Sequence, residues 1–361
     1  MSLKEIANRC GTSVATVSRV LNTPGYHCHK KGLEEKIWAA AEELHYTPNA
    51  YAKSLRMGHK TKSVPLTIDI LLTRFDSMDK DDFFLELFEY TKKELLENDC
   101  VLGDVLTVPD MAALAAKEQK AKQVPYRSSK KITAEQGTNS ALFVSQKPHA
   151  GLLIFGKCPA DMIPVLKKRY AYLVGIDRNP TDYQYDEVIC NGVTAAEKAV
   201  DHLISLGHKN IAYIGDCTYE ARYIGFYQAL LNHKIPLRYE NVYQTTQTKE
   251  EGRKMMLEIL KKPEKPTAIF CANDCTAIGV LQALAKNRRK GYMPSVISID
   301  NIDAAQKTSP MLTTIHIPKQ EMVHLALMLL LDQKKGHHKE NVRIELPCHL
   351  IERESCFYFH S

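Results

Sequence analysis

Beyond residue 66, short apolar runs alternate with longer stretches whose apolar residues recur at helical spacing. A short apolar run between polar turns is typical of a buried strand, and helical spacing indicates an amphipathic helix. The pattern predicts strands at 67–72, 151–155, 172–176, 210–214, 268–272 and 296–299. It predicts helices at 82–98, 195–206, 221–233, 249–261, 276–287 and 319–333. Because apolar strands alternate with helices, we expect parallel, doubly wound α/β sheets.

The N-terminal residues follow a different pattern, which indicates helices alone. Ile6, Ala7 and Cys10 recur at helical spacing, and Gly11 stands where a helix C-cap favours a positive φ. Ser13 then provides the N-cap of a second helix. That helix has valine and leucine on one side and small or polar residues on the other. Two helices joined in this way predict a helix-turn-helix, whose second helix lies in the DNA major groove.

The exposed side of this second helix predicts how DNA is read. We expect Val14 and Ala15 to make apolar contacts with base edges and Arg19 to bond guanine. The alternative for Arg19 is that it only holds a phosphate. The polar residues expected to bond phosphates are Ser13, Thr16, Ser18 and Asn22.

The charge distribution supports DNA binding over the alternative, a helical hairpin of the kind found in any soluble protein. Residues 1–62 hold ten lysines and arginines and five glutamates, which is +5 of the chain's total of +6. A basic segment on a nearly neutral body is the electrostatic footprint of a nucleic-acid-binding protein. We therefore expect double-stranded DNA as a partner.

The string from Ser13 to Asn22, together with the string from Pro48 to Leu55, resembles the lactose/galactose-repressor (LacI/GalR) family of bacterial transcription regulators. The resemblance continues to Cys356. It implies a hinge helix that forms in the minor groove of a pseudo-palindromic operator, with Leu55 as the apolar wedge between base steps. The alternative is that Leu55 packs on the body as a core residue. The implied hinge residues are Asn49, Ala50, Lys53 and Leu55.

The resemblance also implies the domain organisation and the fold class. An all-α helix-turn-helix headpiece and its hinge helix would precede a periplasmic-binding-protein-like core of two doubly wound subdomains. The expected segments are a headpiece at 1–47, a hinge at 48–57, a linker at 58–66 and an effector-binding and dimerisation domain at 67–356. The expected subdomains are an N-subdomain at 67–178 and 318–344 and a C-subdomain at 179–317 and 345–356. The polar, lysine- and glutamine-rich residues 107–148 fit this pattern poorly and are interpreted as an exposed insertion.

Polar residues at the ends of the predicted strands indicate a ligand site. Ligands of open α/β sheets bind at the carboxyl ends of the strands. Carboxylates, an amide and a guanidinium can bond the hydroxyl groups of a sugar in pairs, while aromatic rings stack on its C–H faces. From this set we expect Arg222, Asn273 and Asp300 to contact a ligand. Asp216 and Asp274 are interpreted as turn formers or helix caps.

The resemblance implies the same ligand site and extends it. It adds the aromatic pair Phe83 and Phe84, and Asp177 at a strand end. A position that is often aromatic in the family is Gln247 here, which removes one stacking wall. The effector implied is a small molecule, and we expect a sugar. A nucleobase or a phosphoprotein co-repressor stays open as the alternative.

Composition and cysteine usage limit the classes of protein to which this chain could belong. No run of 18 apolar residues exists and no signal pattern opens the chain, so we expect a cytoplasmic protein that contacts no membrane. The ten cysteines are scattered and are interpreted as reduced, mostly buried thiols. We expect no cofactor and no metal, and interpret His337 and His338 as part of a surface loop. The short C-terminus holds no leucine heptads, so we expect a homodimer.

Two functions from other classes were weighed. Carboxylates at strand ends would also suit a glycosidase, but the headpiece argues against an enzyme. A sugar-binding transport receptor would need a signal peptide and no headpiece. We therefore expect a DNA-binding regulator, a repressor of carbohydrate-utilisation genes, with no catalytic residue.

Overall fold

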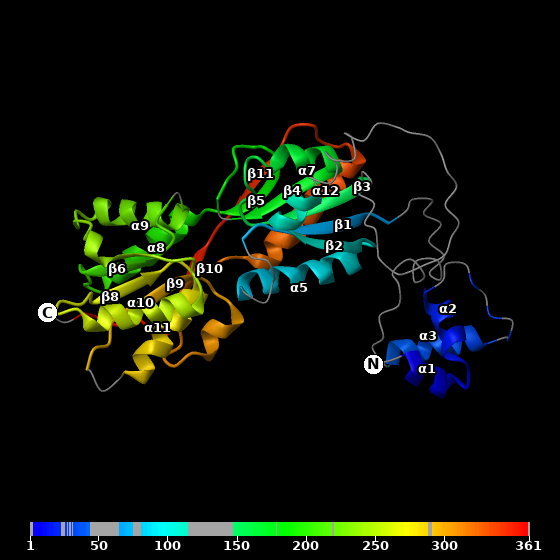
Figure 1. The fold of residues 1–361 in the computed structure, drawn as a ribbon, viewed down its shortest axis with the longest axis horizontal. Coiled ribbons are helices and arrows are strands. Elements are labelled where there is room, and N and C mark those ends of the chain that lie inside the picture. Colours follow the sequence, from blue (N-terminus) through cyan, green and yellow to red (C-terminus); the bar gives the residue numbers. More distant parts are fainter. Residues whose placement is uncertain are drawn as a thin grey trace. The chain divides into compact units, whose positions relative to one another are not determined.

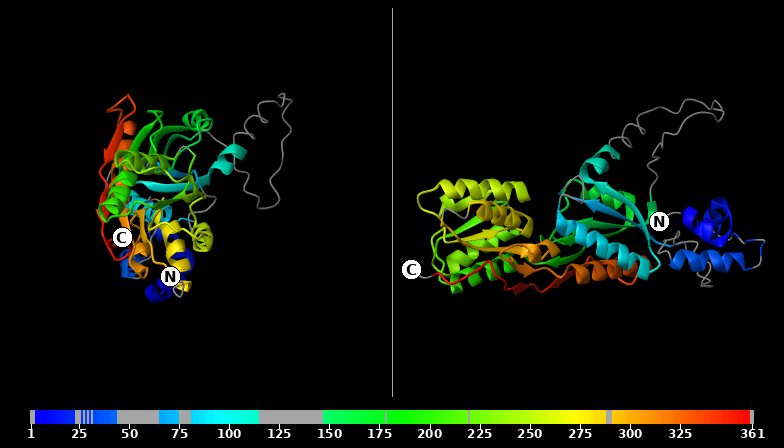
Figure 2. Two further views of the ribbon diagram at one scale, coloured as in Figure 1. Left: turned by 90° about the vertical axis from the view of Figure 1, so that its left-hand side faces the viewer. Right: turned by 90° about the horizontal axis from the view of Figure 1, so that it is seen from below.

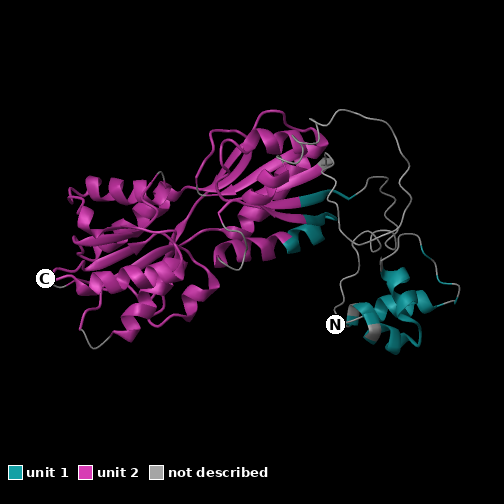
Figure 3. Cartoon of the chain, viewed as in Figure 1, with its two compact units in different colours: residues 1–68, 92–103 teal, residues 69–91, 104–361 magenta. Residues whose placement is uncertain are grey.

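The computed structural model describes residues 3–22, 26, 28, 30, 32–43, 65–74, 81–114, 147–177, 179–218, 220–287 and 291–359. The chain divides into two compact units (Figure 3). One comprises residues 1–68 and 92–103, and the other comprises residues 69–91 and 104–361.

The N-terminal segment forms helices α1 (Leu3–Cys10), α2 (Val14–Asn22) and α3 (Leu33–Glu43) (Figure 1). Between α1 and α2, Gly11 adopts φ 63°, a conformation that a Cβ disfavours. The apolar faces of the three helices meet in one small core. Its buried residues are Ile6, Ala7, Val17, Val20, Leu21, Ile37, Trp38, Ala40 and Ala41. The predicted helix-turn-helix is confirmed.

The strands of the described residues form two six-stranded sheets. The first has the order β11-β5-β4-β3-β1-β2, and β3, β4, β5 and β11 pair in parallel. Its strands are β1 Thr67–Leu72, β2 Val101–Thr107, β3 Lys147–Phe155, β4 Tyr170–Asp177, β5 Asp186–Cys190 and β11 Arg343–Leu346. Its helices are α5 Asp82–Glu97, α7 Ile163–Arg169 and α12 Lys319–Lys335.

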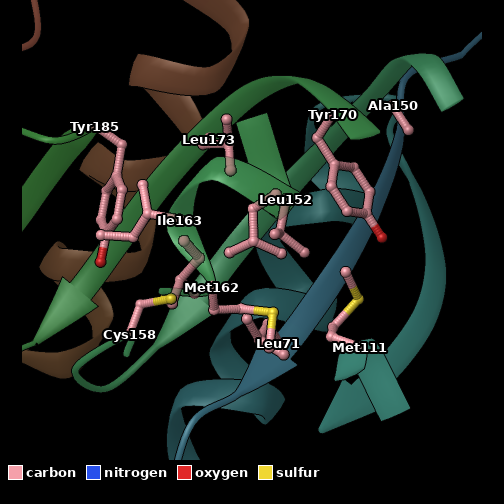
Figure 4. Close-up of a cluster of buried hydrophobic side chains, with 12 residues drawn as sticks. Leu71, Met111, Ala150, Leu152, Cys158, Met162, Ile163, Tyr170, Leu173 and Tyr185 are labelled. Atoms are coloured by element: carbon pink, nitrogen blue, oxygen red, sulfur yellow. The ribbon is translucent and has the colours of Figure 1, made fainter. Parts of the chain in front are cut away.

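Side chains of β1, β3, β4 and α7 fill the core beside the first sheet (Figure 4). Leu71, Leu152 and Leu166 are fully buried there, and Met111 packs against them from the short helix at 108–114. This cluster covers one face of the sheet, and Leu153 and Phe155, which point to the other face, are fully buried as well. Both faces are therefore covered, which explains why the predicted strands are apolar on successive residues.

The second sheet has the order β12-β10-β9-β8-β6-β7, with only β12 antiparallel to its neighbour among the strands described. Its strands are β6 Ile211–Gly215, β7 Val242–Gln244, β8 Ala268–Cys271, β9 Ser295–Asp300, β10 Thr313–His316 and β12 His349–Ile351. Helices α8 and α9 cover one face, and α10 and α11 cover the other (Figure 1 and Figure 2). The helices are α8 Gly192–Ser205, α9 Ala221–Asn232, α10 Lys249–Lys261 and α11 Asp274–Lys286, with 3₁₀ turns at Tyr239–Asn241 and Asp303–Lys307.

The expected fold class is confirmed: all six predicted strands and all six predicted helices of the body are present, most with ends shifted by one to three residues. The pattern did not predict six strands, because each is short or has its apolar residues interrupted by polar ones. These are β2, β5, β7, β10, β11 and β12.

The expected subdomain boundary after residue 178 needs correction. Strand β5 pairs with β4 and β11, so the first sheet continues to Cys190. The apolar pattern did not predict β5, because its first two residues are buried carboxylates. Asp186 accepts hydrogen bonds from Gln333 and His338, and Glu187 forms an ion pair with Arg343. His338 lies in the loop after α12 and is anchored there by the buried Asp186.

The chain passes between the sheets at three places: after Cys190, between His316 and Lys319, and between Leu346 and His349. Of the expected insertion at 107–148, residues 108–114 are helical and 147–148 begin β3, whereas 115–146 lie outside the described residues. No helix in the described part of the chain is long and apolar enough to span a membrane.

Candidate functional site

The exposed side of α2 carries the residues predicted to read bases. Val14 is 43% exposed, and Ala15 and Arg19 are exposed beside it. On the opposite side, Val17 and Leu21 are fully buried. The helix therefore presents one face to solvent and anchors the other in the headpiece core.

Ser13 caps this helix, as predicted. Thr16 N donates a hydrogen bond to Ser13 Oγ at 3.1 Å, and the two hydroxyl oxygens lie 2.9 Å apart. Ser18 is half-buried, and Asn22 ends the helix with a side chain outside the described part. Phosphate bonding by these polar residues stays a prediction.

The hinge positions lie outside the described residues. This applies to Asn49, Ala50, Lys53 and Leu55. Their roles in the minor groove stay predictions from the sequence.

Arg222 is the centre of a buried polar network at the start of α9. Its Nε donates to Glu220 Oε1 at 2.6 Å, NH1 donates to the Ala272 carbonyl at 2.9 Å and NH2 donates to Gln247 Oε1 at 2.9 Å. Only 3% of Arg222 is exposed. Burial opposes its charge, but the attraction of Glu220 and Asp300 outweighs burial and raises the pKa of Arg222.

Gly225, three residues after Arg222, lies where α9 packs against α8. A Cβ at this position would lie 2.3 Å from the Val193 carbonyl oxygen of α8. Glycine therefore lets α9 lie directly against α8 and holds Arg222 in place.

Asn273 lies beside this network and caps α11. Its Oδ1 accepts hydrogen bonds from Thr276 N at 3.0 Å and Thr276 Oγ1 at 2.6 Å, and its Nδ2 donates to the Gln247 carbonyl at 3.1 Å. Gln247 has φ 67° and is 2% exposed. The amide of Asn273 keeps one Nδ2 hydrogen beyond these contacts, so its structural role leaves little capacity for a ligand.

Asp300 ends β9 in a constrained loop. Asp300 has φ 129° and Asn301 has φ 49°, both in the region that favours glycine. Lys319 Nζ donates to the carbonyls of Asp300 at 2.7 Å and Asn301 at 3.1 Å. The contacts offset the strain of a loop that places Asp300, 1% exposed, within the electrostatic reach of Arg222.

Asp216 forms a turn, as expected, whereas Asp274 is not the cap of α11 but its first residue, and Asn273 is the cap. Asp274 accepts hydrogen bonds from Ser298 Oγ at 2.5 Å, Thr314 Oγ1 at 2.6 Å and Ile302 N at 2.8 Å. Burial raises the pKa of the Asp274 carboxyl to about 6, although these bonds favour its charged form. Asp216 forms a turn by accepting from Thr218 N at 3.0 Å.

Phe83 and Phe84 are buried at the start of α5, 3% and 5% exposed. Phe84 stacks on Phe155 with ring centroids 6.4 Å apart, and Lys319 Nζ lies 5.5 Å from the centre of the Phe83 ring. Asp177 is half-buried at the end of β4. The two rings are therefore covered by protein, whereas the predicted stacking wall would need exposed ring faces.

Three contacts join the start of α5 and the preceding loop to the body of the second sheet. Lys249 Nζ lies 2.8 Å from Asp82 Oδ2, and its pKa is raised because this bond outweighs burial. Asp303 N donates to Glu86 Oε1 at 2.8 Å. A third bond, 2.5 Å long, runs from Arg74 NH2 to the Thr246 carbonyl.

Sequence reasoning missed the partners that hold these ligand-site residues in place. The main ones are Glu220, Glu86, Asp82, Lys249 and Lys319. Glu220 could have been found from its spacing, two residues before Arg222 at a predicted helix start. Lys319 and Glu86 are far apart in the sequence and gave no signal.

Comparisons with known proteins agree with this architecture. Residues 2–49 match the family described as "Bacterial regulatory proteins, lacI family", and residues 200–356 match a "Periplasmic binding protein-like domain". The chain is 32% identical to the HTH-type transcriptional repressor PurR of Erwinia tasmaniensis over 362 residues, which covers 98% of this chain and 96% of the relative.

Solved structures share the fold. The transcriptional regulator CelR in complex with cellobiose has a TM-score of 0.65 and 21% identity, covering 99% of this chain and 100% of that one. The lac repressor dimer bound to operator and the anti-inducer ONPF has a TM-score of 0.63 and 21% identity, covering 99% of each chain.

Proposed function

Because the chain belongs to the lacI family of bacterial regulatory proteins, we propose that it represses carbohydrate-utilisation genes. A sugar bound between its two α/β subdomains switches its affinity for the operator. The observation that carries the sugar is the Arg222 network. It combines a guanidinium, carboxylates and an amide around one buried point. Such groups suit hydroxyls, which donate and accept at once.

The charge balance of this site favours a neutral ligand. Arg222 is balanced by Glu220 and Asp300, and Lys319 is balanced by Glu86 at 3.2 Å. A phosphoryl group would require cations that are not already engaged by carboxylates. A phosphoprotein co-repressor is therefore less well supported at this site than a sugar.

Phe83 and Phe84 offer little stacking surface to either effector, since they expose 3% and 5% of their surface. This loss weighs more on a planar nucleobase, which relies on stacking, than on a sugar, which relies mainly on hydrogen bonds to its hydroxyls. Gln247 stands where the family often has an aromatic residue, and its side chain is bonded to Arg222. The alternative nucleobase effector would need these rings to turn outward.

The headpiece supports the proposed binding to an operator. A homodimer would present two copies of α2 to a pseudo-palindromic site, with the exposed Val14, Ala15 and Arg19 at the bases. The solved lac repressor is a dimer on its operator. The proposal places the protein in the cytoplasm with the chromosome and gives it no catalytic role.

A thermal-shift screen tests the effector. We would compare ribose and cellobiose with adenine and guanine, because a ligand of the native state raises the unfolding midpoint. A sugar should raise the midpoint of the wild type and of the exposed-site control Arg238→Met, but not of Arg222→Met. A shift with a nucleobase alone would favour the alternative, and hydrolysis of the bound sugar would contradict the absence of catalysis.

A further inference from the structure

Two histidines stack beside the strand that carries Asp300. His316 ends β10, and its partner across the antiparallel pair with β12 is His349. The centroids of the two rings are 4.7 Å apart, with an interplanar angle of 46°. On its other side, His316 is the neighbour of Asp300 across the parallel pair of β10 with β9 (Figure 1). The half-buried His316 therefore stands between a predicted effector residue and the passage that leads from the second sheet to α12.

The amide of Asn301 determines the protonation state of His316. Arg353 NH2 donates a hydrogen bond to Asn301 Oδ1 at 2.7 Å. Arg353 is itself held in place, because its NH1 donates to the Leu312 carbonyl at 2.7 Å. The amide therefore turns its nitrogen toward His316, and Nδ2 lies 3.0 Å from Nδ1 of the ring. Because Nδ2 can only donate, Nδ1 accepts, so the imidazole is neutral and carries its proton on Nε2.

The bond to His316 helps to hold a strained turn. Asn301 has φ 49° and follows Asp300, whose φ is 129°. Asn301 N also donates to Thr314 Oγ1 at 3.3 Å, and its carbonyl accepts from Lys319 Nζ at 3.1 Å. Each of these contacts offsets part of the cost of the left-handed backbone. Together they keep Asp300 in the conformation that ends β9.

The surroundings of His316 disfavour a second proton on its ring. Burial is the largest of the causes that lower the pKa of His316 below its ordinary value of 6.5. The charges of Lys319 and His349 lower this pKa further, and Glu321 of α12 opposes them in part. The other charged groups near the ring are the guanidinium bonded to the same amide and the carboxyl on the adjacent strand, Arg353 and Asp300. A proton on Nδ1 would face the amide N–H that now donates to it, so protonation breaks this bond.

We propose that His316 is a positioning residue of the effector site, which holds the Asn301 turn and Asp300 in place while neutral and releases them when protonated. Acidification adds one proton to Nδ1, and the hydrogen bond from Asn301 is lost. The imidazolium also repels the ammonium of Lys319, which holds the same turn. Asp300 is then less well ordered, so the sugar binds more weakly in acid than at neutral pH. The loss of sugar affinity rests on the proposed function, whereas the release of the turn does not.

NMR spectra of the imidazole nitrogens test the local step without effector or DNA. The full chain is labelled on its histidine rings, and the signal of His316 is the one lost in His316→Asn. At neutral pH this signal should show the Nε2–H tautomer, and its titration midpoint should lie below 6.5. Asn301→Ala should raise the midpoint, because the bond that favours the neutral ring is removed. An Nδ1–H tautomer in wild type, or an unchanged midpoint in Asn301→Ala, overturns the proposal.

The pH profile of sugar affinity tests the positioning role. Calorimetry with ribose or cellobiose, whichever raises the unfolding midpoint, is carried out at about pH 7.5 and about pH 5.5. His316→Asn places an amide oxygen near the position of Nδ1, where it accepts the same bond but takes up no proton. Wild type and the control His233→Asn, which removes an exposed histidine of α9's C-cap, should lose affinity several-fold in acid. His316→Asn should keep most of its affinity, and His316→Ala should bind weakly at both pH values.

The comparison with His316→Asn separates this effect from other titrations. Asp274 titrates in the same range in every variant, so the difference between wild type and His316→Asn is the quantity that counts. Equal losses of affinity in these two proteins overturn the positioning role. Absence of sugar binding by wild type at neutral pH counts instead against the proposed function. The tautomer of His316 then still decides whether this residue holds the turn.

Discussion

The buried ammonium of Lys319 donates a hydrogen bond to the Asp300 carbonyl at 2.7 Å. Asp300 ends β9 of the second sheet, whereas Lys319 begins α12, which packs on the first sheet. The same ammonium lies 3.2 Å from Glu86 Oε2 of α5. Lys319 therefore contacts both subdomains. A ligand that moves Asp300 also disturbs the ion pair between Lys319 and Glu86, which connects the effector site to α5.

Replacing Lys319 with methionine should destabilise the protein. The substitution leaves the Glu86 carboxylate partly buried without its cation and releases the strained loop at Asp300. Breaking a buried pair costs about 3 kcal/mol, measured as a loss in the free energy of unfolding in urea. The control Lys261→Met removes an exposed cation paired with Glu258 and should cost less than about 1 kcal/mol. Equal losses in the two variants would contradict a structural role for Lys319.

Arg222→Lys should weaken effector binding although it keeps the charge. A lysine cannot reach Glu220, Gln247 and the Ala272 carbonyl together, because it lacks the planar fork of arginine. We expect sugar affinity to fall by about 10- to 100-fold, or roughly 1.4–2.8 kcal/mol, by titration calorimetry. Operator affinity without sugar should stay at the wild-type value. Unchanged sugar affinity would remove Arg222 from the site.

Arg19 distinguishes base reading from phosphate holding. Arg19→Lys keeps a cation for a phosphate but loses the bidentate bonds to guanine, worth about 1–3 kcal/mol of discrimination. Operator selection should therefore show relaxed preference at one position in each half-site. Uniformly weaker binding with unchanged preference would mean that Arg19 holds a phosphate.

Leu55→Ala tests the predicted hinge. Loss of an apolar wedge should reduce operator bending and specific affinity, while sugar affinity in the absence of DNA is kept. Bending is measured by energy transfer between dyes at the ends of the operator. Bending equal to that of the wild type would show that Leu55 is not the wedge.

Asp274 should make stability depend on pH. Its pKa of about 6 in the folded state lies above the ordinary value of 3.8, so the folded state binds the proton more tightly. Its contribution to stability is therefore full below about pH 4 and is lost as pH rises through about 6, a change of about 3 kcal/mol. Subtracting urea-unfolding free energies of Asp274→Asn from those of the wild type between about pH 4 and pH 7 isolates this change. A difference that rises with pH would contradict the direction.

The sequence alone determined the elements that have a local signal, such as a cap or turn, or a periodic apolar pattern. The Gly11 turn, the Ser13 cap and the apolar side of α2 are local, so they could be read along the chain. The long apolar strands were predicted for the same reason: a strand covered on both faces is apolar throughout. Arg222 was correctly placed at a helix start beside a strand end.

Tertiary structure decided which side chains meet. Strand β5 was missed because its buried carboxylates find partners in Gln333, His338 and Arg343, all more than 140 positions away. Lys319 reaches Asp300 because it follows β10, which pairs in parallel with β9, and only the tertiary fold brings Glu86 of α5 to the same ammonium. The free energy of a buried charge depends on such distant partners, and the apolar periodicity of the sequence does not indicate which residues they are.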